Sequence, residues 1–260
     1  MKDCSTWLKS VRFYTKEIKS PGSDESITDR QERVSGFKQS IMNNLRVVQI
    51  GAGGLGGEIS QGLVRKGVRF LKIFDGDTVE LSNLSRQLFY EEDLYKNKAV
   101  CLAKNLVKEG IRKTEIIAYP FMFQKAVEKE IDTTCDIVIC APDNDETRIF
   151  VSRYFYKTTP AIFTGLDRQA NTGYIFIQEP GKTSFLDAFP NSNEKREPCP
   201  NTPAIIDIVK IVAGYILFAV DSATMNRKRN WNYRQFFLGG FISEVIRKIE
   251  KNCPISKINY

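Results

Sequence analysis

The chain has 260 residues, of which 42% are hydrophobic, so it can bury the core of one large domain or of two small ones. It contains no histidine, which excludes histidine-based acid–base triads and Cys/His zinc clusters. The formal net charge is +7, but the chain has no long run of Arg and Lys, so the charge is only a weak indication of nucleic-acid binding, which we do not expect. A positive charge of this size suits the binding of ATP or of an acidic protein partner.

The cysteine pattern and the hydropathy favour a cytoplasmic location. Six cysteines, none of them in a Cys-x-x-Cys pair, stand at positions 4, 101, 135, 140, 199 and 253, and no signal peptide opens the chain. The most apolar run, residues 204–220, carries Asp207 and Lys210. It is too short and too charged to span a bilayer, so we expect no association with a membrane.

The first 27 residues are mixed and polar, with a break at Pro21-Gly22-Ser23. We expect an N-terminal arm over residues 1–27, mobile or docked on a partner, with one short helix around residues 7–18. Residues 28–45 carry a helical pattern that leads directly into the first strand, so the main domain is expected to span residues 28–260.

A glycine-rich turn follows that strand. The run Val47–Ile50 is typical of a buried parallel strand. A turn follows it, with four glycines before a helix begins: Gly51, Gly53, Gly54 and Gly56. Such a turn brings backbone N–H groups and a helix N-terminus close to a phosphate. A second strand, residues 70–74, ends in Asp75, whose carboxylate can bind ribose hydroxyls. This motif taken alone favours a dinucleotide such as NAD.

The remaining pattern alternates strands with helices and predicts an α/β fold, a Rossmann-like, doubly wound, mostly parallel sheet with antiparallel C-terminal strands. A long loop, rich in Pro, Asn, Ser, Glu and Lys, covers residues 180–202. The predicted elements are a helix over 99–107, strands at 114–119 and 136–141, a helix through 149–155, strands at 161–164 and 174–177, a strand at 231–241 and a terminal helix at 242–250.

The stretch Asp75-Gly-Asp-Thr-Val-Glu-Leu-Ser-Asn-Leu-Ser-Arg-Gln87 resembles the ThiF/MoeB-type adenylating enzymes, which are related to ubiquitin-activating enzymes. The resemblance extends over residues 28 to about 225. It includes Arg30 followed by Gln31, Lys98, and Asp143-Asn144 with Arg148 after it. Where the family carries a glycine before the lysine, this chain has Tyr95.

The resemblance implies ATP and Mg²⁺ as cofactors, because adenylation builds charge on phosphoryl oxygens and needs cations around them. Arg86 and Lys98 would hold the phosphates, Asp143 would hold the magnesium ion, and Arg30 would act across a homodimer interface. The other nucleotide-binding residues that it implies are Asp75 on ribose, with Asp77, Asn83, Gln87 and Asn144. Two alternatives stay open: Arg86 and Lys98 taken singly are solvated surface cations, and Asp143 only caps the following helix.

Cys199 is the candidate catalytic thiol. It lies at the end of the long loop, in Glu197-Pro-Cys-Pro-Asn-Thr-Pro203, just ahead of a predicted helix start that favours a thiolate. The resemblance implies that such a loop cysteine accepts the activated carboxylate; the alternative is an inert loop thiol. Cys101, Cys135 and Cys140 are expected to be structural. The paired Cys-x-x-Cys motifs of many relatives are missing, so we expect no zinc.

The predicted function is therefore ATP-dependent adenylation of the C-terminal carboxylate of a small ubiquitin-like or sulfur-carrier protein, followed by thioester transfer to Cys199. Further partners would be a conjugating enzyme or a sulfur donor. The alternatives are a catalytically inactive scaffold of the same fold, or an adenylating enzyme that acts on a small molecule, a peptide or a tRNA base.

Overall fold

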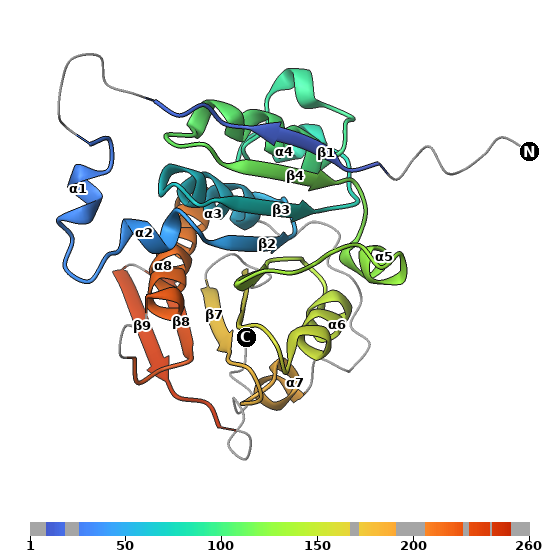
Figure 1. Ribbon diagram of the computed structural model, residues 1–260. Helices are drawn as coiled ribbons and strands as arrows, with labels where there is room; N and C mark the ends of the chain where they lie inside the picture. Colours follow the sequence, from blue (N-terminus) through green and yellow to red (C-terminus); the bar gives the residue numbers. More distant parts are fainter. Residues whose placement is uncertain are drawn as a thin grey trace, which may run out of the picture.

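The computed structural model describes residues 9–18, 26–166, 172–190, 206–225, 229–239 and 241–250. Figure 1 shows one twisted sheet that runs through this part of the molecule, with helices on both of its faces. The helices are α1 (Asp29–Glu32), α2 (Gln39–Met42), α3 (Gly54–Arg65), α4 (Lys98–Leu106), α5 (Phe123–Glu128), α6 (Asp145–Phe155), α7 (Phe185–Ala188) and α8 (Ile206–Thr224).

The sheet has the strand order β1-β4-β3-β2-β5-β6-β7-β8-β9. Its five central strands, from β4 to β6, are parallel to one another, and the strands on either side of them are antiparallel. This confirms the predicted fold class. The strands are β1 (Val11–Tyr14), β2 (Arg46–Ile50), β3 (Phe70–Phe74), β4 (Glu115–Tyr119), β5 (Ile137–Cys140), β6 (Ala161–Leu166), β7 (Thr172–Gln178), β8 (Tyr233–Gly239) and β9 (Phe241–Arg247).

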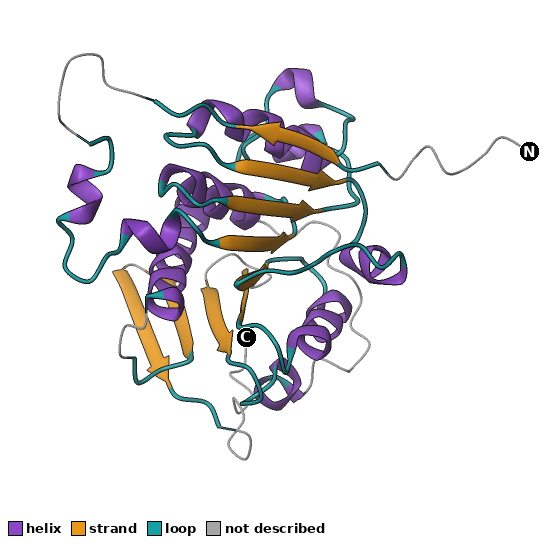
Figure 2. Cartoon of the chain, in the orientation of Figure 1, coloured by secondary structure: helices purple, strands orange, loops and turns teal. Residues whose placement is uncertain are grey.

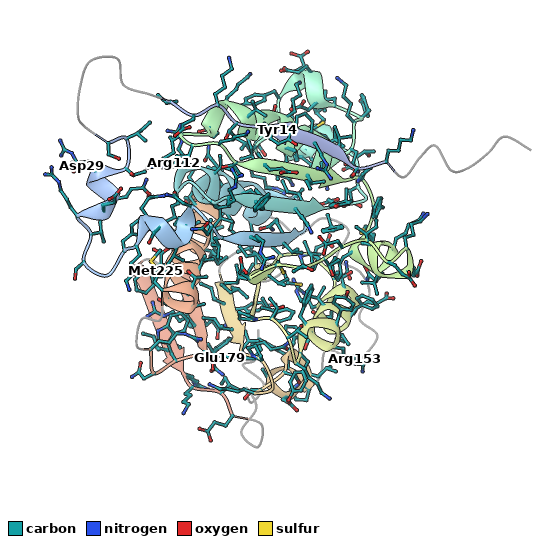
Figure 3. All side chains as sticks on the ribbon, in the orientation of Figure 1. Tyr14, Asp29, Arg112, Arg153, Glu179 and Met225 are labelled. Atoms are coloured by element: carbon teal, nitrogen blue, oxygen red, sulfur yellow. The ribbon has the colours of Figure 1, made fainter. Side chains whose placement is uncertain are left out.

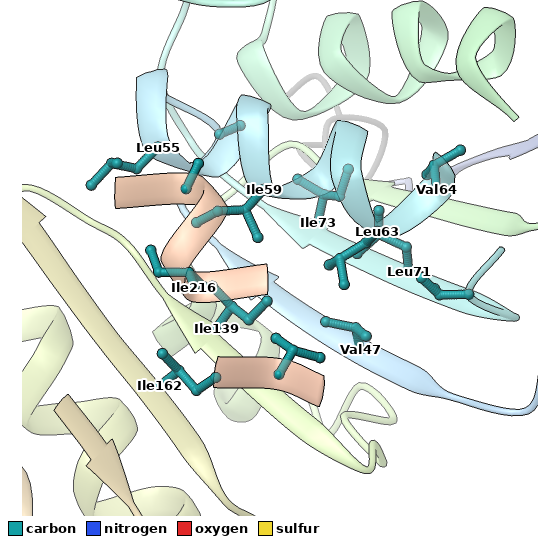
Figure 4. Close-up of a cluster of buried hydrophobic side chains, with 14 of the residues drawn as sticks. Val47, Leu55, Ile59, Leu63, Val64, Leu71, Ile73, Ile139, Ile162 and Ile216 are labelled. Carbon is teal, nitrogen blue, oxygen red and sulfur yellow. The ribbon is translucent and has the colours of Figure 1, made fainter. Parts of the chain in front are cut away.

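Buried side chains lie on both faces of the sheet because side chains alternate along each strand. On one face, Val47 and its neighbours pack against α3, α4 and α8, as the close-up in Figure 4 shows for α3 and α8. On the other face, Val48, Ile50 and Phe74 pack against α5, α6 and α7. Figure 2 shows these helical layers around the strands.

The chain reverses its direction of travel across the sheet at β2. From β2 it moves outward through β3 to β4, and it then returns to β5, which pairs with the opposite side of β2. In open α/β sheets this reversal leaves a crevice at the carboxyl ends of the two central strands, where ligands bind. The glycine turn after β2 and the Asp143-Asn144 pair after β5 both lie at this edge.

Two predicted helices are wrong. Within residues 7–18, the described part contains strand β1, which extends the sheet by pairing antiparallel with β4. Residues 242–250 were expected to form a terminal helix, but residues 241–247 form strand β9, which pairs with β8 as a hairpin. In both cases pairing with the neighbouring strand of the sheet outweighs local helical spacing; this strand is distant in the sequence for β1 and directly precedes β9. The division of the chain at residue 27 stays an interpretation, although β1 joins the same sheet.

The cysteines that the structure describes are structural, as expected. Cys101 and Cys140 are buried, and Cys135 is half-buried. Burial raises the pKa of the Cys101 thiol to about 11 and that of Cys135 to about 12. Among the described residues, no helix is long and apolar enough to cross a membrane.

Candidate nucleotide site

The turn after β2 requires glycine at its first position. Gly51 has φ +92°, and a Cβ there would lie 2.7 Å from the carbonyl oxygen of Ala141, directly after β5. The backbone N–H of Gly51 donates to Phe74 O at the end of β3, at 2.9 Å. The turn therefore begins wedged between the carboxyl ends of the strands on either side of β2, where a side chain has no room.

The N-terminus of α3 is suited to bind an anion. Its N-cap residue, Gly53, makes no side-chain capping hydrogen bond, and the nearest atom to a Cβ there would be Gln87 Nε2, at 3.9 Å. At Gly56, by contrast, a Cβ would overlap the carbonyl oxygen of Gly51. The first turn of this 12-residue helix thus presents backbone N–H groups and the positive end of the helix dipole. The sequence predicts a phosphate at this position, and the first turn of α3 offers the donors that a phosphate would need.

Asp75 is fixed to the turn by its carboxylate. The residue is 8% exposed; Oδ2 accepts a hydrogen bond from Ala52 N at 2.7 Å, and Oδ1 accepts one from Asp77 N at 2.8 Å. The pKa of Asp75 is raised to about 6, mainly because the carboxyl group is buried. The hydrogen bonds from the two backbone N–H groups and the charge of Lys98 oppose this rise, whereas the charge of Asp77 adds to it. Both oxygens keep free lone pairs, so the carboxylate can still accept ribose hydroxyls.

Lys98 is held at the same edge. It is the first residue of α4, its Nζ lies 3.2 Å from Asp77 Oδ2, and its side chain is 14% exposed. Its backbone N–H donates to Asp77 O at 2.9 Å. Asn97 caps α4 through its side-chain oxygen and donates from Nδ2 to the carbonyl oxygens of Asp75 and Asp77. Lys98 is therefore not a freely solvated surface cation, although its charge remains available to a phosphate.

The Asn83–Gln87 segment lies against the start of α3. Asn83 is buried, and its Oδ1 accepts from Glu80 N at 3.0 Å, while its carbonyl oxygen accepts from the backbone of Arg86 and Gln87. The Arg86 carbonyl oxygen would be 3.3 Å from a Cβ on Gly54. Gln87 Oε1 is buried and has no partner in the described part of the chain. Because this atom is an acceptor, a phosphate oxygen cannot satisfy it, but a hydroxyl or amino group of a ligand or an ordered water can.

Asp143 does not cap the helix that follows it. Asn144 is the N-cap residue of α6, and its Oδ1 accepts from Thr147 N at 2.8 Å. The Asp143 carboxylate is exposed, and its neighbour Asn144 contacts it only at 3.4 Å. Arg148 lies beside this pair: it donates to the backbone oxygen Pro142 O at 2.6 Å and to the side-chain oxygen Asp145 Oδ1 at 2.7 Å. A single solvent-facing carboxylate next to a phosphate cradle fits Mg²⁺, which keeps several waters and phosphate ligands.

One predicted site residue, Arg30, is not brought to this edge. Arg30 is exposed on α1. This helix lies near the start of β4, because the hydroxyl of Thr28, directly before α1, accepts a hydrogen bond at 3.1 Å from Nη2 of Arg112, which precedes β4. Figure 3 shows Asp29, the residue before Arg30, on the side of the molecule where the parallel strands start. Cys199 lies outside the described residues. Among the described residues, no group of three or more Cys, Asp or Glu side chains is arranged to hold a metal ion.

The sequence-based interpretation missed Gln49 and Asn97. Gln49 is fully buried in β2, and its Nε2 donates to Gly51 O at 2.9 Å. The available signal was a polar residue within an apolar strand, two positions before the first glycine of the turn. For Asn97 the signal was its place directly before Lys98, which is a favoured N-cap position.

Comparison with known proteins decides the family. The profile of the ThiF family matches residues 28–253. The chain belongs to the ThiF family. One family relative, the NEDD8-activating enzyme E1 catalytic subunit of Arabidopsis thaliana, is 37% identical over 120 residues, which cover 45% of this chain and 26% of the relative.

A second ThiF-family relative is the sulfur carrier protein ThiS adenylyltransferase of Bacillus subtilis, 32% identical over 158 residues, which cover 58% of this chain and 47% of the relative. The chain thus spans less than half of the length of these two curated relatives. Among solved structures, E. coli MccB superposes with a TM-score of 0.70 at 18% identity, over 88% of this chain and 72% of that one. This likeness confirms the fold.

Proposed function

We propose that this ThiF-family protein binds ATP with Mg²⁺ and adenylates the C-terminal carboxylate of a small ubiquitin-like or sulfur-carrier protein. One observation carries the proposal: the Asn83–Gln87 segment packs against the glycine turn, with Arg86 O next to Gly54 and Gln87 next to Gly53. A dinucleotide site needs the turn and Asp75 but not this additional segment. Adenylation needs it, because charge develops on the phosphoryl oxygens.

In the proposed reaction, a carboxylate oxygen of the carrier protein attacks the α-phosphorus of ATP, and pyrophosphate leaves as the bond between the α- and β-phosphates breaks. The backbone N–H groups at the start of α3 would hold phosphate oxygens, and Arg86 and Lys98 would stabilise the charge that forms on them. Asp143, with Asn144 beside it, would hold Mg²⁺, which supplies further positive charge when bound. Asp75 would accept the ribose hydroxyls.

Nucleotide choice is tested by isothermal titration with MgATP and with NAD. Binding of MgATP without comparable binding of NAD is expected, and tight NAD binding without ATP binding would overturn the proposal. Lys98→Ala and Asp143→Ala should each slow carrier-dependent exchange of labelled pyrophosphate into ATP by about 10²–10³-fold. An unchanged rate for both variants would exclude Lys98 and Asp143 from the reaction. Absence of exchange in the parent protein would leave it as a scaffold, and exchange driven only by a small molecule or a peptide would change the substrate class.

Transfer to Cys199 forms the second half of the proposal and rests on the sequence. Since phosphoryl transfer is complete before a thiol acts, Cys199→Ala should retain pyrophosphate exchange but lose a reductant-sensitive adduct with the carrier. Cys199→Ser should trap an oxyester that survives reductant. If Cys199→Ala forms the thiol-sensitive adduct as well as the parent protein does, Cys199 is an ordinary loop residue.

The carrier class is inferred from the relatives, two of which are named for NEDD8 and for the sulfur carrier ThiS. A sulfur donor or a conjugating enzyme would then act after the carrier is activated. We also propose a cytoplasmic homodimer in which Arg30 completes the site of the neighbouring subunit. The exposed position of Arg30 on α1, away from the carboxyl edge of its own sheet, supports this arrangement.

A further inference from the structure

Gln49 is a polar side chain in the most buried part of the sheet. It lies on β2 between Val48 and Ile50, is 0% exposed, and faces the same side as Val47, toward α3. A buried amide in such a strand lowers the stability of the fold unless hydrogen bonds satisfy it. Its bonding pattern therefore indicates what it does.

The amide of Gln49 holds one end of the peptide group between Gly51 and Ala52. Because Gly51 has φ +92°, its carbonyl oxygen is directed inward, where Gln49 Nε2 donates to it at 2.9 Å. Gly56 closes the space behind: a Cβ there would overlap Gly51 O and lie 3.1 Å from Gln49 Nε2. The other end of the same peptide group, Ala52 N–H, donates to Asp75 Oδ2 at 2.7 Å.

We propose that Gln49 is a positioning residue of the nucleotide site, which fixes the Gly51–Ala52 peptide and, through it, the carboxylate of Asp75. The inference rests on the proposed function, in that it treats the turn and Asp75 as the place where nucleotide binds. Gln49 touches neither the phosphates nor the ribose and acts through the peptide that it holds.

The unpaired oxygen of Gln49 separates this role from a purely structural one. Gln49 Oε1 is buried and has no hydrogen-bond partner in the described part of the chain. An amide that only stabilised the fold would use both of its ends, whereas this one leaves an acceptor unpaired in the core. A side chain of the same length without polar atoms removes this unpaired acceptor but leaves Gly51 O without its donor, so the two effects on folding stability oppose each other while the peptide is released.

The test is Gln49→Met, which keeps the length of the side chain and removes the donor. We expect little net change in the free energy of unfolding in urea, with MgATP bound about 5- to 10-fold more weakly, the loss expected for one hydrogen bond. The matched control is Gln235→Met on β8, an amide that is equally buried and also carries an unpaired atom, Nε2. It should leave MgATP affinity unchanged.

Titration of Asp75 in the nucleotide-free protein is the second readout. Ala52 N–H lowers the pKa of Asp75, so releasing it in Gln49→Met should move the carboxyl titration, followed by ¹³C NMR, to higher pH than the parental value of about 6. Asp77 and Lys98, the charged groups that face Asp75, are unchanged in the variant. The Gln235→Met control should titrate as the parent does.

The outcomes separate the two proposals. If Asp75 titrates at higher pH in Gln49→Met while the parent does not bind MgATP, the positioning role holds and the proposed function fails. If the parent binds MgATP and Gln49→Met binds it equally well with an unchanged Asp75 titration, the positioning role is overturned. A loss of affinity that matches a loss of folding stability would also overturn it.

Discussion

Tyr95 lies in the left-handed backbone region, which residues other than glycine rarely adopt. It has φ +63° and is 81% exposed, and its backbone N–H donates to Val79 O at 2.9 Å in the segment that leads to Lys98. A non-glycine residue in the left-handed region carries about 1–2 kcal/mol of strain. Because the ring buries little surface in the described structure, little of that strain is offset by packing.

Tyr95→Gly should therefore raise the free energy of unfolding by about 0.5–1 kcal/mol, since relief of strain exceeds the added entropy of the unfolded chain. Urea denaturation measures the change. Tyr14→Gly is the matched control: this tyrosine is 49% exposed on β1, has no positive φ, and should lower stability when replaced. A drop in stability for Tyr95→Gly would mean that the ring makes a stabilising contact.

Single residues differed in how far their sequence revealed their role. Gly51 and Asp75 could be predicted, because a turn with positive φ and a carboxylate after the next strand are local properties of the chain. The bond from Gln49 to Gly51 could not, since an amide in a buried strand has many possible partners. Nor could the choice of Asn144 over Asp143 as the cap of α6, because both residues suit that position.

At the level of elements, the crossing of α3 and α8 depends on one glycine. A Cβ on Gly62 of α3 would overlap Leu217 Cδ1 on α8 and lie 2.9 Å from its Cδ2. The contact is extended by two ion pairs, Lys66 with Asp221 at 2.6 Å and Lys210 with Glu58 at 2.9 Å. The two helices can approach closely only where a side chain is missing.

Gly62→Ala should lower the free energy of unfolding by about 1–2 kcal/mol, because overpacking outweighs the better helix propensity of alanine. Gly214→Ala on α8 is the control, since no atom lies within 4 Å of a Cβ there, and it should raise stability by up to about 1 kcal/mol. Both changes are measured by urea denaturation. Equal effects at the two positions would show that α8 moves away from α3 without loss.

Most central elements were predictable, apart from the short helices α5 and α7, the second of which lies in the predicted long loop, and two terminal elements were not. The strands from β2 to β6 and the helices α3, α4 and α6 combine local propensity with a clear pattern of burial. Strand β1 forms only because β4, about 100 residues later, offers a free edge for pairing. Strand β9 has helical spacing of apolar residues, yet it follows β8 directly and pairs with it as a hairpin.

For the whole molecule, the proposed dimer makes a prediction about mixed subunits. Arg30→Ala and Asp143→Ala proteins should each be inactive in pyrophosphate exchange, while their mixture should recover about a quarter of the parental activity. Half of the dimers are then mixed, and each mixed dimer contains one complete site. The control is each variant mixed with itself. No recovery, with subunit exchange shown by differently tagged chains, would exclude a shared site.

The packing of α8 against α3 has a consequence for synthesis of the chain. Leu55, Ile59 and Leu63 of α3 are buried, and α8 supplies part of their cover, with Val209 as close as 3.5 Å to a Cβ on Gly54. On the ribosome, α3 emerges well before residues 206–224 have been translated. The nascent nucleotide-binding half therefore exposes an apolar helix face until late in translation, which makes it a substrate for chaperones. Chains released before residue 206 should aggregate rather than persist as a smaller nucleotide-binding domain.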